Sequence, residues 1–220
     1  MARRKDQVAR REQLIQATLD TIAERGLVGA SLKSIADVAG ISPRLVAYYY
    51  PDLESLIEAA HQAATERYYS SRQEVLRDDA GPPQKLARLI RSGLPRGDDR
   101  LLSQALNEIA VNAGRSRIHA TLMTLLFDRE VSLYTAVLEA GRTSGDFVLQ
   151  EPVDVIARNF VALEDALGMH LLAQNSSVDL ERAEQQLASL ARATTGADVL
   201  RSDDQASSRP QHRRAAGTAD

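Results

Sequence analysis

Residues 31–57 of this 220-residue chain read SLKSIADVAGISPRLVAYYYPDLESLI, and this stretch decides the fold of the N-terminal part. Ser31 stands at a helix N-cap, and apolar residues recur at helical spacing until Gly40, which favours a helix end. Ser42 is a second N-cap, and Pro43 suits the first position of the next helix. The pattern predicts a helix over 32–39, a tight turn and a helix over 43–50, which together form a helix-turn-helix.

The second helix of such a motif can enter the major groove of double-stranded DNA. Helical periodicity directs Val46 and Tyr50 toward the core, against a preceding amphipathic helix over 11–26. The residues that remain outward on the second helix are Pro43, Arg44, Leu45, Ala47 and Tyr48. Arg44 can donate two hydrogen bonds to guanine, so we expect it to read a base.

Three consecutive tyrosines end this helix, in a chain that has six tyrosines and no tryptophan. Neighbouring residues of a helix point in three directions, so Tyr48 and Tyr49 are expected to present their hydroxyl groups to phosphates while Tyr50 is buried. The alternative is that all three rings cover a small hydrophobic core.

Residues 10–57 resemble the DNA-binding head of the TetR family of transcriptional regulators. The matching positions are Ser31, Ile35, Ala36, Ala39, Gly40, Ile41, Ser42, Tyr49, Tyr50, Glu54 and Leu56. The resemblance implies a homodimer that binds a palindromic DNA operator, most often as a repressor that a small-molecule effector releases. It adds Lys33 and Ser42 to the expected DNA-binding residues. The chain departs from the family pattern at Arg44, at Ala47 and at Leu53, where a phosphate-contacting lysine is usual.

The rest of the chain predicts an all-α body. Helical patterns cover 53–77, 85–94, 100–113, 117–141, 153–175 and 180–194, and sustained period-two alternation is absent. We therefore expect a DNA-binding domain over 1–52, a ligand-binding and dimerisation domain over 53–195, and a disordered tail over 196–220, whose composition is polar. Arg3, Arg4 and Lys5 are expected to form a flexible basic arm that could contact DNA.

The segment 153–172 is apolar nearly all round, which indicates a helix that is central or packed on a partner. With 180–194 it is expected to form half of a four-helix dimer interface. Segments 136–147 and 153–172 also resemble the C-terminal domains of regulators of the BetI type. Polar residues inside this helix and on two others are expected to line a ligand cavity, or alternatively to lie at the dimer seam or on the surface: Asn107, Glu108, Asn112, Tyr134, Glu164, Asp165 and His170.

Composition restricts the other function classes. The chain has no cysteine, and it shows no secretion signal and no apolar run long enough to span a membrane, so a cytoplasmic protein without cofactor is expected. Residues 1–50 hold eight basic and five acidic side chains, a net of +3 within a chain of net charge −3, which suits a head that faces a polyanion. No nucleophile constellation, Gly-rich phosphate loop or metal-ligand spacing of the four histidines indicates an enzyme. A helical interaction protein with a non-functional helix-turn-helix, or less favourably an enzyme, remains the alternative.

Overall fold

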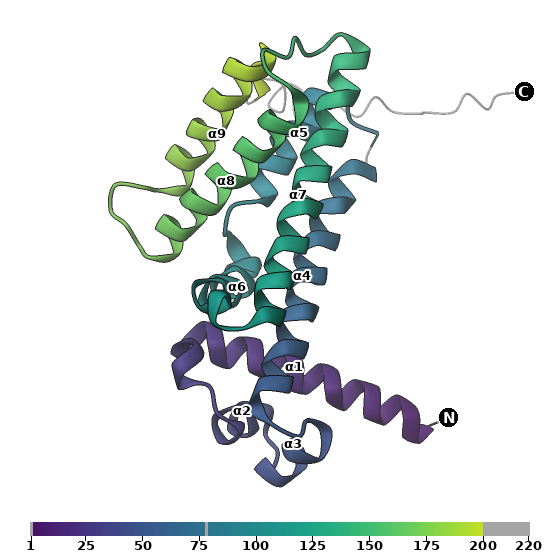
Figure 1. Ribbon diagram of the computed structural model, residues 1–220, viewed down its shortest axis with the longest axis vertical. Coiled ribbons are helices and arrows are strands. Elements are labelled where there is room, and N and C mark those ends of the chain that lie inside the picture. The colour runs from purple at the N-terminus through teal and green to yellow at the C-terminus, as the bar shows by residue number, and fades with distance from the viewer. Residues whose placement is uncertain (1, 78, 200–220) are drawn as a thin grey trace, which may run out of the picture.

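The computed structural model describes residues 2–77 and 79–199, and the regular structure of this part is entirely helical (Figure 1). The all-α prediction is thereby confirmed. The helices are α1 (Ala2–Gly29), α2 (Leu32–Ala39), α3 (Pro43–Tyr49), α4 (Leu53–Arg77), α5 (Pro82–Ser92), α6 (Arg100–Asn112), α7 (Arg117–Ser144), α8 (Val153–Leu172) and α9 (Leu180–Thr195), with short 3-10 turns at Gly97–Asp99 and Ala113–Arg115.

Local capping defines the ends of the two helix-turn-helix elements. The hydroxyl of Ser31 accepts a hydrogen bond from the Ser34 amide while Ser34 Oγ accepts one from the Ser31 amide, which closes a capping box. Gly40 ends α2 with a φ of 65°, a left-handed conformation that costs glycine little. Ser42 caps α3, with Pro43 at its first position, as expected.

The head has a small core that α1, α2, α3 and the start of α4 share. Its buried members are Leu14, Ala17, Ile35, Ala36, Ala39, Val46, Tyr50 and Leu56. Val46 and Tyr50 both face this core, so the predicted orientation of α3 is confirmed. Tyr50 is extended and follows the last helical residue, Tyr49, so α3 ends one residue earlier than expected.

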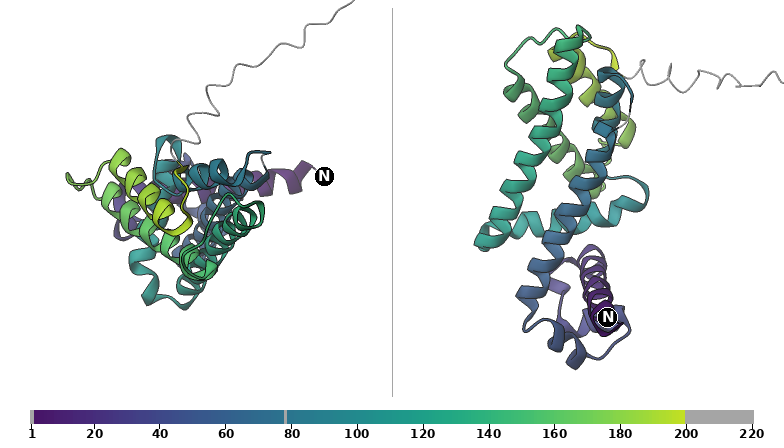
Figure 2. Two further views of the ribbon diagram at one scale, coloured as in Figure 1. Left: turned by 90° about the horizontal axis from the view of Figure 1, so that it is seen from above. Right: turned by 90° about the vertical axis from the view of Figure 1, so that its right-hand side faces the viewer.

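A second core joins the head to the body. Leu19 and Ile22 of α1 pack with residues of α4 and α6, among them Ala60 and Ile109. Helix α4 leaves the head at Leu53 and runs up the body beside α7, as two views show (Figures 1 and 2). Its 25 residues span about 37 Å at 1.5 Å per residue, so one rigid element connects the two parts.

The main body core lies among α5, α7, α8 and α9. Phe160 of α8 stacks on Tyr134 of α7 with ring centroids 4.7 Å apart, and both side chains are fully buried. Helices α8 and α9 lie side by side along one flank of the body (Figure 1). Leu167 and Leu187 face inward from this pair, while Met169 of α8 is 47% exposed.

Both ends of the described chain differ from expectation. Helix α1 begins at Ala2, so the backbone of Arg3, Arg4 and Lys5 is helical and the predicted flexible arm is wrong. At the other end, Val199 is buried in the body core, beyond the boundary predicted at Gly196. The apolar side chain of Val199 packs where a polar tail was expected, and residues 200–220 of that tail lie outside the described residues. Within the described chain, no helix is both long and apolar enough to cross a membrane.

Candidate DNA-binding surface and ligand cavity

Helix α3 buries Val46 in the head core and leaves most of its other residues accessible. Ser42, Pro43, Arg44, Ala47 and Tyr48 are exposed, and Tyr48 keeps 69% of its surface accessible. Lys33 of α2 is exposed as well, while Leu45 and Tyr49 are half-buried. All eight predicted DNA-binding residues therefore retain accessible surface, and Arg44 and Tyr48 lie one helical turn apart on the same face of α3.

Tyr49 is half-buried and contacts Tyr48 and Arg11. Its ring meets Tyr48 edge to face with centroids 5.2 Å apart, and the Arg11 guanidinium lies 5.9 Å from the ring centroid. Arg11 also lies 5.1 Å from the Tyr50 centroid, so one cation of α1 orients both rings at the end of α3. The sequence places Arg11 in a charged run, and nothing local indicates this contact.

The body has a cavity of about 800 Å³ that is open to solvent on one side, a size typical of small-molecule sites. Helices α4, α6, α7 and α8 contribute its walls together with the segment after α5. The lining residues are Tyr68, Gly93, Pro95, Ser103, Leu106, Asn107, Ala110, Val111, Met123, Thr124, Leu126, Phe127, Asp128, Glu130, Arg158, Glu164, Asp165, Ala166, Gly168, Met169 and Leu172.

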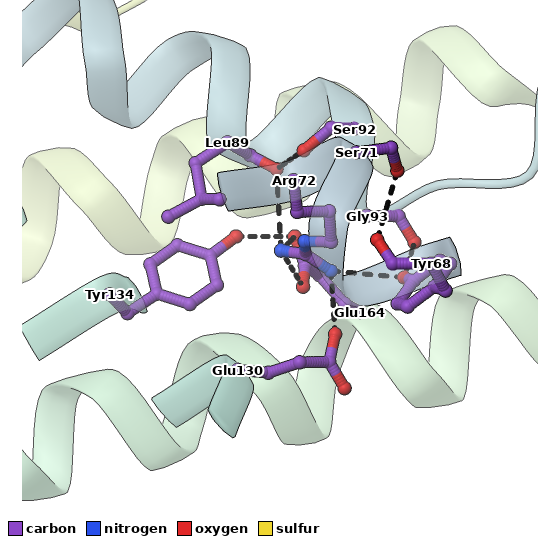
Figure 3. A network of polar contacts seen from close by, with 9 residues as sticks. All are labelled: Tyr68, Ser71, Arg72, Leu89, Ser92, Gly93, Glu130, Tyr134 and Glu164. Carbon is purple, nitrogen blue, oxygen red and sulfur yellow. Dashed lines mark hydrogen bonds and ion pairs between the residues drawn. The ribbon is translucent and has the colours of Figure 1, made fainter. Parts of the chain in front are cut away.

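Arg72 of α4 lies at the centre of a network of polar contacts (Figure 3) that includes the cavity-lining residues Glu130 and Glu164. Its side chain is completely buried, and it donates to Glu130 of α7 at 2.7 Å and to Glu164 of α8 at 2.9 Å. The same guanidinium donates to the Tyr68 hydroxyl at 3.0 Å, and the Tyr134 hydroxyl donates to Glu164. Three helices that are distant in sequence are thereby tied at one point.

Burial raises the pKa values of the acids around Arg72. The pKa of Glu130 rises to about 8 and that of Glu164 to about 7, because desolvation outweighs the attraction of Arg72 in both cases. Desolvation also raises the pKa of Asp165 to about 6, although this residue is accessible where it lines the cavity. One arginine between two buried glutamates leaves a surplus of negative charge, which a proton can neutralise.

Some of the residues predicted to line a ligand site line this cavity, and others do not. Asn107, Glu164 and Asp165 line the cavity. Glu108, Asn112, Tyr134 and His170 are not among the described residues that line it.

Each of these four residues has another neighbour. Glu108 Oε2 would lie 3.3 Å from a Cβ atom placed on Gly26 of α1, and Asn112 donates to the Glu108 carbonyl. Tyr134 lies behind Glu164, and His170 hydrogen-bonds Asn175 at 3.2 Å. The sequence does not show which of these side chains point into the cavity, because tertiary packing sets the rotation of each helix about its axis.

Two buried histidines meet at the head end of the body, which sequence spacing did not predict. His61 Nδ1 of α4 and His119 Nδ1 of α7 lie 2.9 Å apart, so one nitrogen donates to the other. His61 Nε2 is buried and has no hydrogen-bond partner in the described chain. Desolvation, and secondarily His119, lowers the pKa of His61 to about 4. Groups of three or more ligating side chains that could hold a metal are absent from the described part of the chain.

Comparison with known proteins finds relatives of the head by sequence and relatives of most of the chain by fold. No family model matches the chain. The N-terminal part is 52% identical over 50 residues to the HTH-type transcriptional regulator BetI of Paraburkholderia phytofirmans, and 49% identical over 51 residues to that of Stenotrophomonas maltophilia. These matches cover 23% of this chain, and the chain spans about a quarter of the length of these relatives, 26% in each case.

Among solved structures, a TetR transcription regulator from Haloarcula marismortui superposes with a TM-score of 0.77 at 23% identity, over 86% of this chain and 99% of that one. A protein from Saccharomonospora viridis, described as a transcriptional regulator and solved in complex with choline, gives 0.78 at 19% identity, over 84% and 96% of the two chains. The resemblance to TetR-family regulators that the sequence predicts is confirmed in fold, and the relatives are named as regulators rather than enzymes.

Proposed function

We propose that this chain is a DNA-binding transcriptional regulator that acts as a homodimer on a palindromic operator and is released from it by a small molecule. The observation that carries the proposal is the head, in which capping and core packing leave Arg44 and Tyr48 outward on α3 with Lys33 nearby. The sequence relation of the head to BetI regulators supports the same conclusion.

Two kinds of DNA contact follow from the positions on α3. Arg44 lies in the first turn, which reaches deepest into the groove, and its planar guanidinium suits the O6 and N7 atoms of guanine. Tyr48 and Tyr49 lie at the other end of the helix, where their hydroxyls can donate to phosphates and fix the helix on the backbone. Lys33 adds a phosphate or base contact from α2.

Dimerisation is assigned to the outer face of α8 and α9. Val155 and Met169 are 40% and 47% exposed, and the exposed Ala162 and Ala166 lie between them on the same face of α8, where they permit close approach of a second copy. Ala166 and Met169 also line the cavity, so this face adjoins the cavity opening. A two-fold axis through this face pairs the same surfaces of both copies. Leu167 and Leu187 point into the body, so substitutions there would report on folding rather than on dimerisation.

A ligand in the cavity has two short routes to the head. Helix α4 lines the cavity through Tyr68 and enters the head core through Leu56. Leu106 of α6 lines the cavity as well and also belongs to the core shared with α1. A displacement of either helix therefore changes the position of α1 and α3 relative to the body. The choline complex of the Saccharomonospora neighbour supports a small-molecule site in a body of this fold.

Binding of the full chain to the DNA that flanks its own gene tests the proposal, by fluorescence anisotropy at fixed salt. Arg44→Ala is expected to weaken binding by about 1–3 kcal/mol per half-site and to relax preference at one base pair. Arg67→Ala, which removes an exposed arginine of α4 outside the head face, is the matched control and should bind like the parent. A parent that shows no preference for this DNA over an unrelated duplex would favour the interaction-module alternative.

A further inference from the structure

The cavity has an uneven distribution of charge. Its ionisable lining residues are the four acids Asp128, Glu130, Glu164 and Asp165 and one base, Arg158. Arg158 lies seven residues before Asp165, about two helical turns or 10 Å along α8, and its guanidinium lies over the Phe127 ring at 5.7 Å. The acids Glu130, Glu164 and Asp165 interact with one another electrostatically, so the negative charge is concentrated at one end of the cavity.

One carboxylate in this acidic end is incompletely paired. Glu130 is 4% exposed, and its Oε1 accepts the hydrogen bond from Arg72. Its Oε2 makes no hydrogen bond within the described chain and is not one of the fully buried unpaired atoms there, and Figure 3 shows this oxygen on the side away from Arg72. Both oxygens of Glu164 already accept bonds from Arg72, and Tyr134 donates to one of them. Glu130 therefore offers an oxygen without a hydrogen-bond partner at the cavity wall.

Most of the remaining wall is apolar, although Ser103, Asn107 and Thr124 also line it. Side chains of α6, α7 and α8 form the apolar part: Leu106, Ala110, Val111, Met123, Leu126, Phe127, Met169 and Leu172. A ligand in this cavity contacts these apolar groups, which favours an apolar body. A carboxylate ligand would instead bring a negative charge beside Glu130, Glu164 and Asp165.

We propose that the cavity binds an organic cation with an apolar body, whose ammonium group pairs with Glu130 Oε2 and the Asp165 carboxylate. The inference rests on the proposed function in treating the cavity as the effector site of a regulator. The two positive charges, one on Arg72 and one on the ammonium of the ligand, then balance the two negative charges of Glu130 and Glu164. The apolar wall between α6 and α7 then receives the body of the ligand.

Binding of such a cation is coupled to proton release. Without a neighbouring cation other than Arg72, the raised pKa of Glu130, about 8, keeps a proton on this carboxyl near neutral pH. A positive charge beside it favours the ionised form and lowers that pKa, so the ligand displaces the proton. Affinity for the cation should therefore rise as the pH rises from about 6 toward 8, whereas affinity for a neutral ligand of the same body should stay constant.

Three probes with one body separate the ligand classes: 4-phenylbutylamine, 4-phenylbutan-1-ol and 4-phenylbutanoate. Isothermal titration of the full chain, without DNA, measures each. We expect the amine to bind roughly 10-fold or more tightly than the alcohol at about pH 8, and the carboxylate to bind most weakly, because one well-placed charge pair is worth about a factor of ten or more. Titration in two buffers of different ionisation enthalpy should reveal proton release with the amine and none with the alcohol.

Glu130→Gln keeps the acceptor for Arg72 and removes the charge. It should reduce amine affinity by roughly 10-fold and abolish most of the proton release, while it changes alcohol affinity by less than about 2-fold. Glu139→Gln is the matched control on the same helix, because Glu139 pairs with Arg142 on the surface and lies outside the cavity. If Glu130→Gln does not fold, the same measurement is made on Asp165→Asn, which changes an accessible residue.

The proposal is overturned if the alcohol or the carboxylate binds as tightly as the amine, if the amine fails to bind at about millimolar concentration, or if Glu130→Gln and Asp165→Asn bind the amine like the parent. Operator binding of the same preparation, measured without any probe, separates this failure from a failure of the proposed function. A chain that binds its operator but not the amine is a DNA-binding protein whose cavity takes another ligand class.

Discussion

The head and the body of this protein handle charge in opposite ways. In the head, Lys33 and Arg44 are exposed, and the core beneath them is formed by apolar residues and the ring of Tyr50. In the body, Arg72 is fully buried and is paired with Glu130 and Glu164 at the side of a cavity. Exposed cations can meet a large polyanion in water, whereas buried charges must be paired inside the protein and are sensitive to whatever enters beside them.

The same contrast separates their contributions to stability. A surface charge can be removed from the head with little effect on folding, while removal of Arg72 from the body leaves two buried acids without a cationic partner. The head should therefore be fragile at its apolar contacts, and the body at its polar ones. Four experiments test this difference, beginning with the largest expected effect.

Arg72→Ala should lower the free energy of unfolding by about 3–5 kcal/mol, the usual cost of leaving buried partners of an ion pair unsatisfied. The loss should be smaller at about pH 5 than at about pH 8, because Glu130 and Glu164 can then take up protons. Denaturant unfolding at both pH values measures it. Arg67→Ala on the same helix is exposed and should stay within about 0.5 kcal/mol of the parent. Equal losses of unfolding free energy in both variants would contradict the proposed difference between the buried Arg72 and the exposed Arg67.

Tyr50→Ala should destabilise the head by about 3 kcal/mol, because it removes a ring that is 6% exposed and leaves a cavity against α1. Hydrogen exchange of the α2 and α3 amides should accelerate more than exchange in α8. Tyr48→Ala is the control, since that ring is 69% exposed. If both variants exchange alike, the assignment of Tyr50 to the core and Tyr48 to the surface is wrong.

His61 should make the protein less stable in acid. Its folded pKa of about 4 lies below the ordinary value of 6.5, so the unfolded chain takes up a proton first and stability is lost as the pH falls through this window. The loss is on the order of 2 kcal/mol.

The pKa values of Glu130 and Glu164 are raised, and these acids act in the opposite direction, with stability lost as the pH rises toward 7 and 8. The difference in pH slope between the parent and His61→Leu therefore isolates the histidine. Identical slopes in thermal melts between about pH 4 and pH 7 would show that His61 titrates normally.

Tyr49→Phe should give the smallest effect. It removes one hydroxyl from the end of α3 and keeps the ring that contacts Tyr48 and Arg11. Affinity for all DNA sequences should fall by about 0.5–1.5 kcal/mol, the typical worth of one hydrogen bond, with no change of base preference. A panel of single-base operator variants measures this. A changed base preference would mean that Tyr49 reads a base and does not hold a phosphate.

The sequence alone predicted most of the local structure of the helix-turn-helix. The caps at Ser31 and Ser42, the left-handed turn at Gly40 and the inward direction of Val46 and Tyr50 are all found in the structure. These features depend on residues within a few positions of one another, through hydrogen bonds and helical periodicity that neighbouring residues determine. The helix pattern of the body was equally readable, with ends that differ by a few residues in most cases.

Only the tertiary structure decided the chemistry of the body. Arg72 meets Glu130 across 58 positions of the chain and Glu164 across 92, and His61 meets His119 across 58. The polar residue Glu164 inside an apolar helix did indicate a special environment, but Arg72 and Glu130 lie in ordinary charged runs. Which of several polar residues on a helix faces a cavity depends on how that helix rotates to bury its apolar side. The packing of all its neighbours sets that rotation, and the residues next to it in the chain do not.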